Sequence, residues 1–174
     1  YDQVTLTDPS GKTAEQLAEA GGHADAAAAI RANLVLGAAA NGDVPRLEKL
    51  TAGQPPAALP GAALMSYAHS SGHVPLARYL MARWKDEPRT EKEKLFDRGV
   101  TAIHQAAERG HTEAVRAMLD VDWWGGKDAL LAQLRRKESN GGRTPAEYAE
   151  HWSSARSAEA VALLRKTLAD LGAK

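Results

Sequence analysis

The chain has 174 residues, 44% of them hydrophobic, and 22 basic side chains balance 22 acidic ones, so its formal net charge is zero. This hydrophobic content suits a globular protein and excludes a disordered chain. Zero net charge argues against a protein that binds long nucleic acids through their phosphates. The absence of cysteine excludes a disulfide scaffold, a cysteine zinc site and a thiol nucleophile. No apolar run of about 20 residues is present, so we expect no membrane-spanning helix.

A segment of eleven residues recurs along the chain. In chain order, its copies begin at Thr13, Asn33, Ala63, Thr101 and Thr144. The copies at 13, 63 and 101 end in a Gly-His pair, with the glycine nine residues after the first position. The copy at 33 has Gly-Asp in that place, and the copy at 144 keeps only the beginning of the pattern. The recurrence predicts a repeat protein.

Each copy carries residues that begin or end a short helix. A threonine at the first position can accept a hydrogen bond from a backbone N–H of the first turn. Pro145 suits the first helical turn, where its missing N–H is not needed. Glycine takes the left-handed conformation that ends a helix without strain. Apolar residues at helical spacing then predict a second helix after four of the copies: Leu47 and Leu50; Leu76, Tyr79 and Leu80; Val115, Met118 and Leu119; Val161, Leu163, Leu164 and Leu168.

The pattern resembles the ankyrin repeat, whose signature is a Thr-Pro-Leu-His-x-Ala stretch in a unit of about 33 residues. The segment from Thr101 to His111 is the most specific match. The resemblance implies an all-α, ankyrin-type helix–turn–helix solenoid with one short helical insertion. It implies one domain over residues 1–174, with units at about 8–32, 33–60, 61–97, 98–124 and 140–174 and the insertion at 125–139. It also implies that His104 and the Gly-His histidines form hydrogen bonds that hold turns and neighbouring repeats together.

The spacing between copies is uneven, at 20, 30, 38 and 43 residues. The first spacing leaves no room for a β-hairpin between the first two units. The third contains a charged stretch from Lys85 to Arg98, which we interpret as a solvated linker or, alternatively, as a loop that contacts a partner. The fourth contains a Trp-Trp-Gly-Gly sequence at 123–126, followed by a predicted short helix within 128–138.

The insertion contains candidate partner-binding residues. Five basic and two acidic side chains between positions 127 and 143 give this segment a net charge of +3. Trp123 and Trp124, together with Arg135 and Arg136, have the composition of an interface hot spot. The alternative is that both tryptophans cover the end of the preceding helix pair and that the basic residues form a solvated face.

No motif predicts chemistry. Gly11-Lys12-Thr13 is similar to the end of a phosphate-binding loop, but Leu6 stands where that motif requires its first glycine. His69 and His73 could share a metal ion in principle, but no third ligand accompanies them. We therefore expect no catalytic residue, no cofactor and no metal, and we expect neither a small-molecule ligand nor a nucleic acid partner.

The leading hypothesis is a non-catalytic protein–protein interaction module. Its partner protein would contact the concave face, where Gln105, Arg109, Arg143 and Glu147 are candidates, and the insertion. The alternative is a permanent accessory subunit of a large multiprotein assembly. A further rival is a fragment of an enzyme or effector that uses the array as a scaffold. The chain begins at Tyr1, so a targeting peptide could precede it; we expect a soluble protein of the cytoplasm or an organelle interior.

Overall fold

The chain is helical throughout the residues that the computed structural model describes, which are 6–96, 101–139, 141–152 and 155–172. They contain no β-strand, only an isolated bridge between Thr7 and Thr13. The predicted all-α fold is therefore confirmed. The chain divides into two compact units, Tyr1–Gly53 and Gln54–Lys174, and each is described by itself below. The single domain and the repeat boundaries stay predictions, and the boundary at 97/98 lies outside the described residues.

Unit 1 contains α1 (Ala14–Ala20), α2 (Ala24–Ala40) and α3 (Val44–Leu50). The sequence predicts that no hairpin follows residue 32. The structure explains why, because α2 runs without interruption through this point. Its 17 residues span about 25 Å, and both α1 and α3 pack against it. One helix therefore takes the place of the second helix of the first predicted unit and the first helix of the next.

Unit 2 consists of helix pairs and three connecting helices. The pairs are α4 (Gly61–Ser70) with α5 (Val74–Arg83), α7 (Ala102–Glu108) with α8 (Thr112–Met118), and α11 (Pro145–Trp152) with α12 (Ala158–Gly172). The connecting segments hold α6 (Arg89–Phe96), α9 (Val121–Trp124) and α10 (Lys127–Leu134), with short 3-10 helices η2 (Pro56–Ala58) and η3 (Ala155–Ser157).

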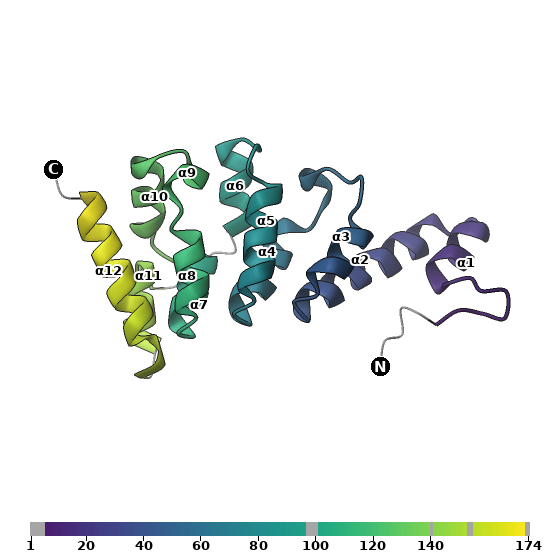
Figure 1. Ribbon diagram of the computed structural model, residues 1–174, viewed down its shortest axis with the longest axis horizontal. Coiled ribbons are helices and arrows are strands. Elements are labelled where there is room, and N and C mark those ends of the chain that lie inside the picture. Colours follow the sequence, from purple (N-terminus) through teal and green to yellow (C-terminus); the bar gives the residue numbers. More distant parts are fainter. Residues whose placement is uncertain (1–5, 97–100, 140, 153–154, 173–174) are drawn as a thin grey trace. The chain divides into compact units, whose positions relative to one another are not determined.

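The pairs of unit 2 stack in two layers, which can be followed in Figure 1. Helix α7 packs between α4 and α11 in one layer, and α8 packs between α5 and α12 in the other. The side chains between the layers are fully buried, and alanines such as Ala68 and Ala106 allow close helix approach. The largest of these core residues are Leu64, Met65, Leu76, Leu80, Ile103 and Met118.

The turns before α2, α3, α5 and α8 are closed by the same backbone bond. The N–H of His23, Asp43, His73 and His111 donates to the carbonyl oxygen five residues earlier, at 2.8–2.9 Å. The preceding glycines all have φ between 68° and 74°, a conformation that L side chains rarely adopt. Because the bond uses only main-chain atoms, Asp43 replaces histidine without changing the turn.

The long connections are folded segments. The stretch expected to be a solvated linker contains α6, which packs on α4. Lys92 of α6 donates to the carbonyl oxygen of Trp123 at 3.1 Å, and Gln133 of α10 donates to Glu93 at 3.5 Å. Helix α10 matches the predicted insertion helix and packs on α12. The two longest connections of the chain therefore contact each other.

Candidate interaction surface

The exposed sides of α4, α7 and α11 form one candidate surface, which we call the inner-helix face. Two of its aromatic side chains are well exposed, Trp152 at 59% and Tyr67 at 38%. Tyr148 is half-buried, as are two polar residues of α7. The residues of this face are Tyr67, Gln105, Glu108, Arg109, Tyr148 and Trp152.

The aromatic side chains of α11 contact one another. The Tyr148 and Trp152 ring centroids lie 6.4 Å apart, and Tyr148 also meets the edge of the His104 ring at 5.5 Å and 84°. Partial burial raises the pKa of Tyr148, and the charge of nearby Glu108 adds to this effect. Tyr148 thus links an exposed indole to a fully buried imidazole.

His104 anchors this part of the surface. Its Nε2 lies 3.0 Å from the carbonyl oxygen of Arg143, and its Nδ1 lies 2.7 Å from Oγ1 of Thr101. A carbonyl oxygen only accepts hydrogen bonds, so Nε2 donates and the hydroxyl of Thr101 donates to Nδ1. Burial lowers the pKa of His104. The expected role of His104 is therefore confirmed, since it ties α7 to the segment before α11.

Gln105 and Arg109 join α7 to α4. Ser66 donates to Oε1 of Gln105 at 3.4 Å, and Nη1 of Arg109 donates to the carbonyl oxygen of Ser70 at 2.7 Å. The same carbonyl lies 3.3 Å from Nε2 of His111, which bears out the expected bridging role of this Gly-His histidine. Gln105 and Arg109 lie on the inner-helix face, and both also contribute to the packing of neighbouring helix pairs.

Arg143 and Glu147 lie at the start of α11. Nη1 of Arg143 is 3.6 Å from Oε1 of Glu138, whose side chain is 1% exposed. Glu147 accepts hydrogen bonds from the backbone N–H and the hydroxyl of Thr144, each at 2.9 Å. These bonds lower the pKa of Glu147, and the charges of Lys137 and Arg143 add to the effect. Glu147 therefore caps its helix as well as facing solvent.

The tryptophan pair is buried. Trp123 and Trp124 expose 5% and 2% of their surface, and their rings meet edge to face at 4.8 Å. The indole N–H of Trp123 donates to the carbonyl oxygen of Met81 at 2.6 Å, and that of Trp124 to Met118 at 2.8 Å. The structure agrees with the alternative prediction, that both tryptophans cover the end of the preceding helix pair, because each ring finds both apolar packing and a hydrogen-bond acceptor within the chain.

The basic residues of the insertion divide between two places. Arg136 is half-buried, and its charge contributes to the lowered pKa of His104. Arg135 is exposed and follows α10, close to the end of α12: its Nη2 would lie 3.7 Å from a Cβ placed on Gly172. The structure therefore does not gather the predicted contact residues in one patch.

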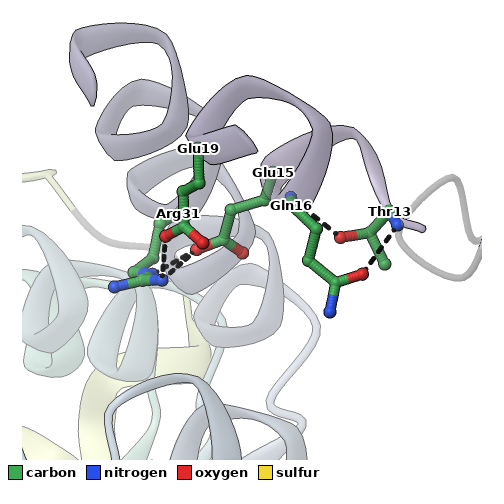
Figure 2. A network of polar contacts seen from close by, with 5 residues as sticks. All are labelled: Thr13, Glu15, Gln16, Glu19 and Arg31. Atoms are coloured by element: carbon green, nitrogen blue, oxygen red, sulfur yellow. Dashed lines mark hydrogen bonds and ion pairs between the residues drawn. The ribbon is translucent and has the colours of Figure 1, made fainter. Parts of the chain in front are cut away.

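Unit 1 carries a separate polar network, shown in Figure 2. Arg31 of α2 points between Glu15 and Glu19 of α1 and forms an ion pair with each. Thr13 and Gln16 cap α1 through reciprocal hydrogen bonds of 3.3 Å and 2.9 Å. These residues border a hollow of about 400 Å³ whose apolar lining consists of Ala14, Ile30, Leu34 and Leu50. The carboxylates of this hollow are thus already bound to a cation of the chain.

A comparison with family models decides the classification. A model described as ankyrin repeats (3 copies) matches residues 34–124, and a second, overlapping match covers residues 64–174. The chain belongs to the ankyrin repeat family. The matched residues start inside α2, so α1 and the first half of α2 lie outside the match. No curated protein and no solved structure matches the chain significantly.

The ankyrin repeats identify surface residues that are absent from the contacts predicted from sequence. Tyr67 and Tyr148 each stand four residues after the first position of their repeat, which is the place that the predicted contact Gln105 has after Thr101. Trp152 stands eight residues after Thr144, as Arg109 does after Thr101. Extending the register of Gln105 and Arg109 to the neighbouring repeats would have found all three aromatic residues.

Ankyrin repeats are generally protein–protein interaction modules, and the family is typically non-catalytic. None of the helices that the structure describes is both long enough and apolar enough to cross a membrane. Within the same residues, no three histidine, aspartate or glutamate side chains are grouped so that they could hold a metal ion.

Proposed function

We propose that this chain is a non-catalytic interaction module that binds a partner protein through the inner-helix face of unit 2. The observation that carries the proposal is the exposure of Trp152, at 59%, beside Tyr148 and on the same face as Tyr67. Tryptophan and tyrosine contribute most to binding when a partner covers them. Mixed charge around them, from Glu108 and Arg109, suits a polar protein surface.

The scaffold beneath this face is held in place before binding. His104 and Arg109 bond to main-chain carbonyls of the neighbouring helix pairs. A surface with few side chains left to order loses less entropy when it binds. The inner-helix face therefore combines exposed aromatic side chains with a fixed backbone.

The residues predicted in and beside the insertion take two roles in the proposed binding: the arginines contact the partner, and the tryptophans position the helices. The charge of Arg136 acts on His104 beneath the inner-helix face, and the charge of Arg143 acts on Glu147 at the start of α11. Arg135 would extend the contact towards α12. Trp123 and Trp124 act as positioning residues, since they fix α9 against α5 and α8 through their indole N–H groups.

A permanent place in a multiprotein assembly is the second candidate. Leu6 and Leu17 of unit 1 expose 68% and 42% of their surface, and obligate interfaces bury more apolar side chains than transient ones. In this case the partner would stay bound after dilution and prolonged washing, whereas a transient partner would be lost.

Site-specific photo-cross-linking tests the proposal. A photoreactive phenylalanine is placed at Tyr67 or Trp152, and at Lys166 on the exposed side of α12 as a control. We expect a discrete cross-linked partner from the first two positions and none from Lys166. Equal cross-linking at all three positions, or none at Tyr67 and Trp152, would contradict the proposal.

A further inference from the structure

A cleft of about 390 Å³ lies on the other layer of unit 2, away from the inner-helix face. Its lining residues come from α5 and the turn after it, from α8, and from α9 with the residue before it. Its volume is near the lower end of the range for ligand pockets, about 300–1,000 Å³. Its lining residues are Arg78, Met81, Ala82, Lys85, Ala117, Asp120, Asp122 and Trp123.

The floor of the cleft is apolar and rigid. Met81 and Trp123, both nearly buried, line it from different helices. They are joined by the hydrogen bond from the Trp123 indole to the Met81 carbonyl. Lys92 also holds Trp123, with its Nζ 5.3 Å from the ring centroid. The floor is therefore present before any occupant arrives.

The cleft is lined by charges of opposite sign that come from different elements. The basic residues are Arg78 of α5 and Lys85 in the turn after it, and the acidic residues are Asp120 before α9 and Asp122 within it. All four are exposed, and none forms an ion pair with another residue in the described part of the chain. Asp120 binds main-chain N–H groups, those of Asp122 and Trp123.

We propose that this cleft binds an extended segment of a partner protein in which acidic and basic residues alternate. Successive side chains of an extended chain point to opposite sides. Alternation therefore directs every acidic side chain towards Arg78 and Lys85 and every basic one towards Asp120 and Asp122. The aliphatic stems of these side chains would cover Met81 and Trp123. The inference is independent of the proposed function, because the two surfaces share no residue.

Two synthetic hexapeptides of identical composition test the proposal. One alternates glutamate and lysine, and the other has three glutamates followed by three lysines, so both have zero net charge. Each is titrated into the ¹⁵N-labelled chain, and the Trp123 indole and the backbone amides of Met81, Lys85 and Asp122 are followed by NMR. We expect the alternating peptide to shift these resonances with at least tenfold higher affinity.

Charge-reversal variants locate the binding. Arg78→Glu with Lys85→Glu should abolish the shifts. The matched control, Lys49→Glu with Lys166→Glu, makes the same change in total charge at exposed positions elsewhere and should preserve them. Equal affinity for the two peptides, shifts outside the cleft, or no shift up to about 1 mM peptide would each overturn the proposal. Failure here leaves the cross-linking result at Trp152 unaffected, and the reverse also holds.

Discussion

Two tryptophans of this chain should respond in opposite ways to replacement by alanine. Trp152 is 59% exposed and Trp124 is 2% exposed. Trp152→Ala should weaken binding of the cross-linked partner by about 2 kcal/mol or more, roughly thirtyfold, because a hot-spot side chain is lost. Its free energy of unfolding should change by less than about 0.5 kcal/mol. Affinity is measured by titration and stability by denaturant unfolding.

Trp124→Ala should instead lower the free energy of unfolding by about 3–5 kcal/mol, because it leaves a cavity and an unpaired Met118 carbonyl. The contrast tests the assignment of one tryptophan to binding and the other to packing. A Trp152→Ala variant that unfolds easily, with unchanged affinity, would reverse these roles.

His69 makes the stability of the chain depend on pH. Its side chain is fully buried in α4, and burial, with a smaller contribution from His111, lowers its pKa from 6.5 to about 3. The unfolded chain therefore binds a proton at His69 more readily than the folded chain. Stability is fully present above about pH 6.5 and falls towards pH 3, by up to about 1.4 kcal/mol per pH unit. His104, whose pKa is also lowered, acts in the same direction.

Denaturant unfolding between pH 7 and pH 4 tests this prediction. His69→Leu should reduce the slope of stability against pH, whatever its effect on stability at pH 7. His23→Leu is the control, since His23 is exposed at the start of α2, and it should leave the slope unchanged. An unaltered slope in His69→Leu would show that this histidine is not the titrating group.

At the scale of elements, two glycine turns with similar backbone angles differ in their surroundings. Gly22 and Gly110 have φ of 74° and 73°. A Cβ on Gly22 would meet open space, whereas one on Gly110 would collide with the carbonyl oxygen of Arg156. Gly22→Ala should cost about 1–2 kcal/mol, the penalty for the left-handed conformation alone. Gly110→Ala should cost clearly more, measured by thermal unfolding. Equal losses would indicate that the segment before α12 yields without strain.

The continuous helix α2 contains a glycine that weakens it. Gly37 lies inside the helix and is exposed, and a Cβ added to it would meet open space. Gly37→Ala should therefore stabilise the helix by about 1 kcal/mol. Ala32→Gly, at another exposed position of α2, should destabilise it by a similar amount. Hydrogen exchange of the α2 amides measures both, and a helix that ended near residue 33 would not respond to Gly37→Ala.

At the scale of the whole molecule, balanced charge predicts weak binding to nucleic acid. The chain carries 22 basic and 22 acidic residues, and Arg143, one of the five basic residues in the +3 segment at 127–143, lies beside Glu138. Fluorescence anisotropy with a short labelled duplex should show no binding at about 150 mM salt. Binding that weakens steeply as salt rises would assign the basic insertion to nucleic acid instead.

Local signals in the sequence were enough to predict the paired helices and most turns of the repeats, but not α6 or the continuity of α2. A capping residue or proline starts a helix, glycine ends it, and apolar residues four apart form its buried side, and all of these act within a few residues. The absence of a hairpin between the first two predicted units, a point that lies inside α2, could also be predicted, because a spacing of 20 residues is too short to hold one. Tyr67 and Trp152 occupy the same repeat positions as Gln105 and Arg109, which were predicted as contacts, although neither aromatic residue was itself predicted.

The sequence by itself determined the ankyrin repeats, the all-α fold and the short helix of the insertion. Only the tertiary structure decided that Trp123 and Trp124 are buried, that α6 packs on α4, and that two basic and two acidic residues from different elements line one cleft. The physical reason is distance along the chain. A helix forms from residues three or four apart, whereas burial of an indole depends on a carbonyl 42 residues away, at Met81.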